Sequence, residues 1–135
     1  MSEELNAIIK EYSQHPLNNF AMENPTVARH EGNFICWDEI TVYLKIDGTT
    51  ITAYSFDGNP STITLAASSF LSEFIIGSDL KEVLMWNYDT MVSHWFEVSP
   101  RRKRAAVIAI MASRNAIHEY LWDTKEDVFD DLIWD

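Results

Sequence analysis

Cys36 and Asp38 are the residues of this chain whose types and spacing point most directly to metal chemistry. They lie two positions apart in the segment NFICWDE, immediately before a strand-like run. Thiolate and carboxylate groups both bind zinc, and structural zinc sites and iron–sulfur clusters take about four ligands, largely thiolates. Because Cys36 is the only cysteine, the pair predicts half of a metal site. The alternative is a small buried thiol beside a solvated carboxylate.

Other catalytic groups are scattered along the chain. The histidines are His15, His30, His94 and His118, and the sequence holds no Gly-x-Ser-x-Gly elbow. A serine hydrolase needs a base and an orienting acid within reach of its serine. We therefore expect Ser61 to cap the helix that follows it, and His118 to titrate at the surface of the last helix. The protein is not expected to be an enzyme.

The run Arg101-Arg102-Lys103-Arg104 holds four of the ten basic residues in a chain of net charge −11. Cations in the first turn of a helix oppose its macrodipole, which costs a few tenths of a kcal/mol each. One interpretation is a solvated face with the acidic tail folded onto it. The other is a site for a partner or an anion, and this run is the candidate partner-binding segment.

The composition limits the class of protein. A chain of 135 residues with 47% hydrophobic residues fits one domain with a substantial core. We expect that domain over residues 1–122 and an acidic C-terminal tail over residues 123–135. The negative charge argues against nucleic acid as a partner, and no apolar run reaches the ~18 residues that span a bilayer. A single cysteine and no secretion signal indicate the cytoplasm.

Hydrophobic periodicity predicts an α+β fold. Alternation across EITVYLKID, followed by Asp47-Gly48, predicts a hairpin whose return strand begins near Ile51 and is broken at residues 57–60. Residues 29–36 are predicted as an edge strand. Helical spacing predicts an N-terminal helix, a helix from Ile63 that ends near Gly77, and a long helix that opens at Ser99-Pro100. One or two short helices are expected within residues 79–97. The five tryptophans are expected to lie mostly in the core.

Four segments in this order resemble the NifU/IscU family of iron–sulfur cluster assembly scaffolds. They are IIKEYSQHPLNN, NFICWDEITVYLKIDG, FDGNPSTITLAASSFLSEFIIGSDLKEVL and PRRKRAAVIAIMASRNAIHEY. The resemblance spans roughly residues 8–120. It implies a small antiparallel three-stranded meander, with an N-terminal helix and C-terminal helices packed on one face.

The resemblance also implies a ligand set, of which this chain keeps only part. Cys36 falls on the first family cysteine and Asp38 on the nearby aspartate. Ser61 stands at the second cysteine and Ala105 at the third, while Arg104 replaces the adjacent histidine. The family holds an iron–sulfur cluster, or zinc in its absence, so Cys36 and Asp38 would be the remaining contacts of an incomplete site.

Three functions follow from the resemblance. The first is a scaffold-like protein that holds or transfers iron, sulfide or a cluster, with missing ligands supplied by a second subunit or by a cysteine desulfurase. The second is a metal-free adaptor of the same fold that binds a desulfurase or another assembly factor. The third is a single-thiol sulfur acceptor. A homo-oligomer is left open.

Overall fold

The computed structural model describes residues 3–134, and side chains from Ala7 onward. The helices and strands are α1 (Glu3–Gln14), β1 (Val27–Asn33), β2 (Asp38–Asp47), β3 (Thr50–Asn59), α2 (Thr62–Ile75), α3 (Leu80–Val83), α4 (Tyr88–Ser93) and α5 (Lys103–Leu121). Three short 3-10 turns are η1 (Phe34–Cys36), η2 (Pro100–Arg102) and η3 (Phe129–Asp131).

The strands form one antiparallel sheet in the order β1-β2-β3, as the meander prediction requires. Residues on β2 alternate between the two faces of the sheet. Ile40, Val42 and Leu44 are fully buried, whereas Thr41 and Tyr43 between them are half-buried. One face of the sheet therefore builds the core and the other faces outward.

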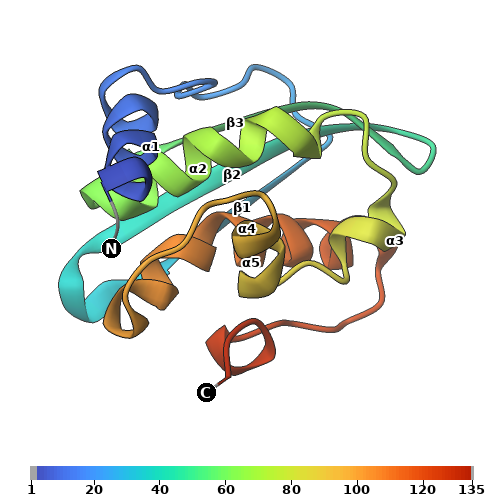
Figure 1. The fold of residues 1–135 in the computed structure, drawn as a ribbon. Helices are drawn as coiled ribbons and strands as arrows, with labels where there is room; N and C mark the ends of the chain where they lie inside the picture. The colour runs from blue at the N-terminus through green and yellow to red at the C-terminus, as the bar shows by residue number, and fades with distance from the viewer. Residues whose placement is uncertain (1–2, 135) are drawn as a thin grey trace.

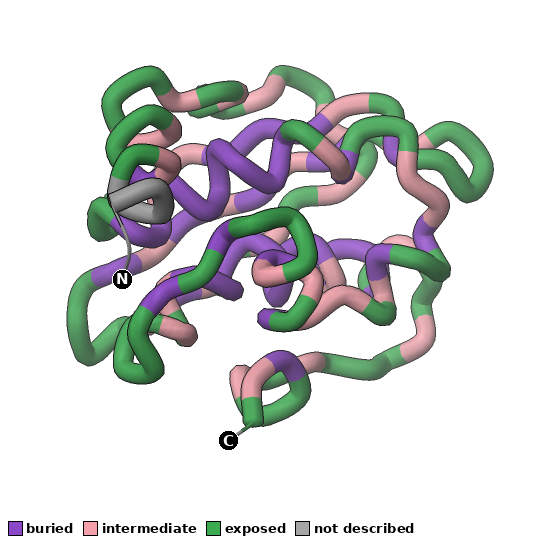
Figure 2. The backbone as a smooth tube through the Cα atoms, in the orientation of Figure 1, coloured by how far each residue is buried: buried purple, intermediate pink, exposed green. Residues whose placement is uncertain are grey.

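Helices α2 and α5 cover the inner face of the sheet, and α1 packs on α2 (Figure 1). Small residues let α2 and α5 approach closely. The buried alanines are Ala66, Ala67, Ala106, Ala109, Ala112 and Ala116. Figure 2 shows buried backbone running along α2, while the outer connections are exposed. The predicted α+β fold, with helices on one face, is confirmed.

Two strand predictions were wrong at their ends. The edge strand stops at Asn33, so Cys36 lies in η1 and not in a strand. Trp37 adopts a left-handed conformation with φ of 56°, which reverses the chain into β2. The return strand continues through residues 57–59, because Gly58 takes a φ of 142° and pairs opposite Ile40. The predicted helices are present, with α2 ending at Ile75, two residues before Gly77, and α3 and α4 lying within residues 79–97. The predicted opening of the long helix at Ser99-Pro100 was wrong, because residues 100–102 form the 3-10 turn η2, the Ser99 side chain makes no capping bond with any described residue, and α5 begins at Lys103.

The acidic C-terminal segment packs against the helices. Leu132 is only 1% exposed, and its carbonyl accepts a hydrogen bond from the Tyr88 backbone N–H at 3.0 Å. Asn115 on α5 exchanges two hydrogen bonds with the Asp127 backbone, at 2.6 and 3.0 Å. No helix among residues 3–134 has the length and apolar character to cross a bilayer.

Candidate functional site

Asp38 is the centre of a hydrogen-bond network that joins β2 to the start of α2. Its carboxylate accepts bonds from the Ser61 backbone N–H at 2.7 Å, the Ser61 hydroxyl at 2.9 Å and the Thr64 hydroxyl at 2.6 Å. Asp38 is buried, with only 6% of its surface exposed. The expectation of a solvated carboxylate was therefore wrong, because three donors compensate for the loss of water.

Ser61 and Thr64 together cap α2. The Ser61 hydroxyl oxygen accepts a hydrogen bond from the Thr64 backbone N–H, which confirms the predicted N-cap. The negative charge of Asp38 also lies at the N-terminal end of α2, where the macrodipole favours an anion. Asp38 thus stabilises the helix, and its oxygens are directed at protein donors.

Thr64 also brings the start of α5 to this network. Its hydroxyl oxygen lies 3.3 Å from the carbonyl oxygen of Ala105, a partly buried residue. The Thr64 side chain therefore contacts both Asp38 and Ala105. The three elements that the resemblance assigns to a metal site do meet in space, but a threonine hydroxyl lies between them.

Cys36 is exposed, and it lies in a turn that projects apolar side chains into solvent. Ile35 is 92% exposed, Trp37 80% and Phe34 61%. The expected burial of the tryptophans was wrong here and at three other positions, because Trp95, Trp122 and Trp134 are also exposed. The Cys36 thiol is therefore accessible from bulk solvent.

The basic run begins in η2 and continues into the first turn of α5. Arg101 and Arg102 are exposed. The ammonium group of Lys103 lies 5.1 Å from the centre of the Tyr88 ring, and the guanidinium of Arg104 lies 5.2 Å from that of Phe129. Among residues 7–134, none of the four cations has a carboxylate within 4.0 Å.

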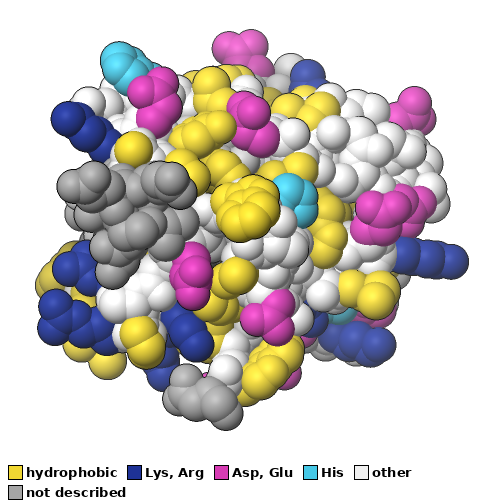
Figure 3. All heavy atoms as spheres, in the orientation of Figure 1, with side chains coloured by type: hydrophobic (Ala, Val, Ile, Leu, Met, Phe, Trp, Pro, Cys, Tyr) yellow, Lys and Arg dark blue, Asp and Glu magenta, His cyan; other side chains and the backbone are white. Residues whose placement is uncertain are grey.

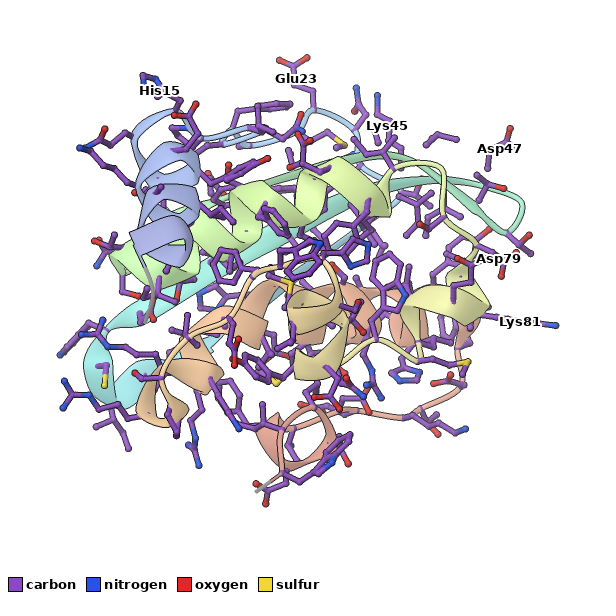
Figure 4. The ribbon with its side chains drawn as sticks, viewed as in Figure 1. His15, Glu23, Lys45, Asp47, Asp79 and Lys81 are labelled. Atoms are coloured by element: carbon purple, nitrogen blue, oxygen red, sulfur yellow. The ribbon has the colours of Figure 1, made fainter. Side chains whose placement is uncertain are left out.

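The exposed turn and the basic run occupy the same end of the molecule. Figure 3 shows Lys and Arg side chains gathered with hydrophobic ones at the lower left, where Figure 1 places η1 and the start of α5. We call this the η1–α5 surface, and define it as the exposed residues of η1, Trp37 and the two exposed arginines of η2, namely Phe34, Ile35, Cys36, Trp37, Arg101 and Arg102. Figure 4 shows Lys45, Asp47 and Lys81 projecting from the opposite end.

The NifU-like N-terminal domain family matches residues 4–127. The chain belongs to this family. Its resemblance to NifU and IscU proteins, first drawn from four segments, is confirmed by a match that covers most of the sequence.

Curated relatives of this NifU-like domain are assembly scaffolds and a sulfurtransferase. The chain is 34% identical over 62 residues to the iron–sulfur cluster assembly scaffold protein IscU of Thermotoga maritima, which is 46% of this chain and 44% of that protein. It is 26% identical over 77 residues to the zinc-dependent sulfurtransferase SufU of Bacillus subtilis, which is 57% of this chain and 52% of that protein. The matches therefore span about half the length of these relatives.

Solved structures have the same fold. A putative iron–sulfur cluster assembly scaffold protein for the SUF system from Fervidobacterium islandicum superposes with a TM-score of 0.73 at 24% identity, covering 87% of this chain and 96% of that one. The N-terminal part of a NifU-like protein from Brucella abortus gives 0.71 at 15% identity, covering 87% and 94%. These likenesses establish the fold of the NifU-like domain.

The donor set of this NifU-like domain does not fit a cluster or zinc. No group of three or more His, Cys, Asp or Glu side chains suited to a metal ion occurs among the described residues. The Asp38 oxygens are bonded to Ser61 and Thr64, and the Ser61 hydroxyl is itself part of that network. Ala105 offers no side-chain ligand, and the Arg104 guanidinium, which lies over the Phe129 ring, cannot bind a cation. Of the predicted ligands, this leaves only the free, exposed thiol of Cys36.

Two groups of contacts were missed by the sequence analysis. Thr64 sits three residues after Ser61, the spacing of a capping interaction, which could have indicated its role. His118 is 7% exposed, so its expected surface position was wrong. Its ring nitrogens lie 2.7 Å from an Asp123 oxygen and 3.0 Å from an Asp127 oxygen, and Asp127 also accepts two bonds from Arg114. These contacts anchor the acidic segment to α5.

Proposed function

We propose that this chain is a metal-free, partner-binding member of the iron–sulfur assembly family and not a cluster-holding scaffold. The observation that carries the proposal is the Asp38 network. Among the described residues, every hydrogen bond that the Asp38 carboxylate accepts comes from Ser61 or Thr64 of this same chain. A metal at this position would have to break a buried, charge-assisted network that stabilises α2.

The η1–α5 surface is the docking face in this proposal. Large apolar side chains at high exposure mark protein interaction sites when polar or charged groups surround them. Trp37 adds a cost in backbone energy, since a bulky residue with positive φ is disfavoured. A tryptophan kept exposed in such a conformation supports a role in binding, because it contributes little to the core.

The partner's chemistry follows from the charges beside the turn. Arg101 and Arg102 are exposed cations without a described counter-ion, in a chain that is otherwise strongly acidic. A complementary partner face is acidic around an apolar centre. We propose a cysteine desulfurase or another iron–sulfur assembly protein as that partner, with no catalytic turnover by this chain.

Metal and sulfide analysis after purification without oxygen tests the metal-free part of the proposal. Iron, zinc and acid-labile sulfide are each expected well below one equivalent per chain. Stoichiometric metal that disappears in both Cys36→Ala and Asp38→Ala would overturn the proposal. That result would favour the scaffold function, with Cys36 and Asp38 as ligands and the remainder supplied by a second copy or a partner.

Affinity capture from an assembly-competent lysate tests the docking part. Trp37→Ala and the pair Arg101→Glu with Arg102→Glu should each lose the captured desulfurase or assembly factor. Lys45→Glu with Lys81→Glu is the matched control, since both cations lie at the opposite end (Figure 4). Equal loss with the control pair would overturn the docking face.

A second candidate function rests on the exposure of Cys36. An accessible thiol could accept sulfur from the persulfide of a desulfurase by thiol exchange, in which the acceptor thiolate attacks the outer sulfur and the enzyme thiolate leaves. Mass analysis after incubation with a desulfurase and cysteine would show a gain of one sulfur on Cys36. No gain on the wild-type chain would exclude this function.

A further inference from the structure

A cavity of about 220 Å³ lies between the basic run and the C-terminal segment. Its lining consists of Pro100, Arg101, Lys103, Arg104, Asp130, Ile133 and Trp134. The cavity is separate from the Asp38 network, which involves none of these side chains. It shares Arg101 with the η1–α5 surface, but η1 contributes no residue to its wall.

The charges of the cavity wall are unbalanced. Among the described residues, three cationic side chains line it, against the single carboxylate of Asp130. The cations of this run form no ion pair with a described residue, so Asp130 shares the cavity without neutralising them at contact distance. Placing like charges together in the first turn of a helix is unfavourable, and an anion between them would relieve that repulsion.

Aromatic contacts restrain two of the cations. Lys103 lies over the Tyr88 ring and Arg104 over the Phe129 ring, at 5.1 and 5.2 Å from the ring centres. Tyr88 is buried, so the position of the ammonium is set by the protein core. Restrained donors lose less side-chain entropy when a ligand binds, which favours binding over a diffuse attraction.

We propose that this cavity binds a phosphate-type oxyanion. Lysine and arginine provide the donors that recognise phosphate, with arginine able to donate two parallel bonds. The volume is below the ~300–1,000 Å³ of pockets that enclose drug-sized ligands. The occupant is therefore free phosphate, or the phosphoryl end of a larger molecule whose remaining part lies along Trp134. The proposal does not depend on the metal-free adaptor function.

Calorimetric titration of the full chain with inorganic phosphate, and separately with a nucleoside monophosphate, tests the proposal. Both are expected to bind with 1:1 stoichiometry. Tighter binding of the nucleotide, lost in Trp134→Ala, would identify the ligand as a larger molecule that places its phosphoryl group in the cavity and a flat ring of its own against Trp134. Equal affinities, unchanged in Trp134→Ala, would identify free phosphate. No heat and no shift of amide signals at 10-fold excess over millimolar protein would overturn the proposal.

Charge variants separate a site from general attraction. Lys103→Gln with Arg104→Gln should weaken phosphate binding at least 10-fold. Arg102→Gln, on the neighbouring exposed position outside the cavity wall, and Lys81→Gln, at the far end of the molecule (Figure 4), should each change it less than 2-fold at fixed ionic strength. Equal weakening in all three would overturn a defined cavity site. Thermal melts verify that each variant is folded.

Asp130→Asn should change the phosphate affinity in the opposite direction. Removing this carboxylate takes one negative charge from the cavity wall, so phosphate should bind more tightly, by at least 3-fold. Asp89→Asn, an exposed carboxylate on α4 outside the cavity wall, is the matched control and should have no such effect. Weaker phosphate binding in Asp130→Asn would overturn the assignment of the cations as the anion donors.

Discussion

The hydroxyl of Thr64 donates a 2.6 Å hydrogen bond to the buried carboxylate of Asp38. This bond links β2 to α2 at the position where the family resemblance places a metal ligand. An acidic side chain that is held by protein donors on both oxygens contributes to folding stability, and its release to a metal would expose those donors without partners.

Thr64→Val is expected to lower the free energy of unfolding by about 1.5–3 kcal/mol, the contribution of one hydrogen bond to a charged group. The substitution keeps the side-chain shape and replaces the hydroxyl with a methyl group, which cannot donate the bond. Thr62→Val, at the exposed first position of α2, should change stability by less than about 0.5 kcal/mol. Urea unfolding of both variants measures the difference. Equal, small effects would show that the Asp38 network is not structural.

Restoring the family residues should restore metal binding. The triple variant Ser61→Cys, Arg104→His, Ala105→Cys provides two thiols and an imidazole at the positions that the family resemblance assigns to ligands, and these are donors that zinc prefers. We expect about one zinc per chain after dialysis, against far less than one for the wild type. The same variant with Cys36→Ala is the control and should bind more weakly. Stoichiometric zinc in the wild type would contradict the metal-free proposal.

Cys36 should react as an exposed thiol in the folded protein. A disulfide reagent such as Ellman's reagent should modify it at close to the rate measured in denaturant, because the protein does not have to unfold to expose the thiol. Cys36→Ser should leave stability within about 0.5 kcal/mol of wild type, as for surface positions away from special features. A native rate many times slower than the denatured rate would show that the thiol is covered.

Trp37→Gly should stabilise the isolated protein by about 0.5–1 kcal/mol, since glycine adopts positive φ without the steric cost of a side chain. Trp37→Ala keeps that cost and should be close to neutral, because the indole is exposed. Thermal unfolding compares the two. A large loss of stability in either variant would mean that the indole packs in the fold, which would remove the argument that it is kept for binding.

Acid should weaken the anchoring of the C-terminal segment at Asp123. The Lys125 backbone N–H lowers the pKa of Asp123 below its usual 3.8; partial desolvation opposes the shift, and the bond with His118 reinforces it. A carboxyl with a lowered folded-state pKa contributes stability above its unfolded value, and that stability is lost as the pH falls through the folded pKa. The Tm gap between wild type and Asp123→Asn should therefore be present at pH 7 and close below about pH 3.8. A gap that stays constant down to pH 2.5 would contradict the assignment.

Most of the fold follows from local patterns in the sequence. Alternation on Ile40, Val42 and Leu44 gave β2 its buried face, and the Asp47-Gly48 turn set the hairpin. The Ser61 cap was also predictable, because capping is a local interaction between residues three apart. Local periodicity and turn chemistry act over a few residues, so they can be read without knowing which segments meet.

The surroundings of Asp38 and Cys36 depend on contacts between distant parts of the folded chain. Asp38 and Thr64 are 26 residues apart, and no local pattern indicates that one bonds the other. The exposure of Cys36 depends on the left-handed turn at Trp37, which replaced the final residues of a predicted strand. The cavity beside Lys103 likewise needs the C-terminal segment to fold back along α5. Burial and charge environment are properties of packed neighbours, and those neighbours come from distant parts of the chain.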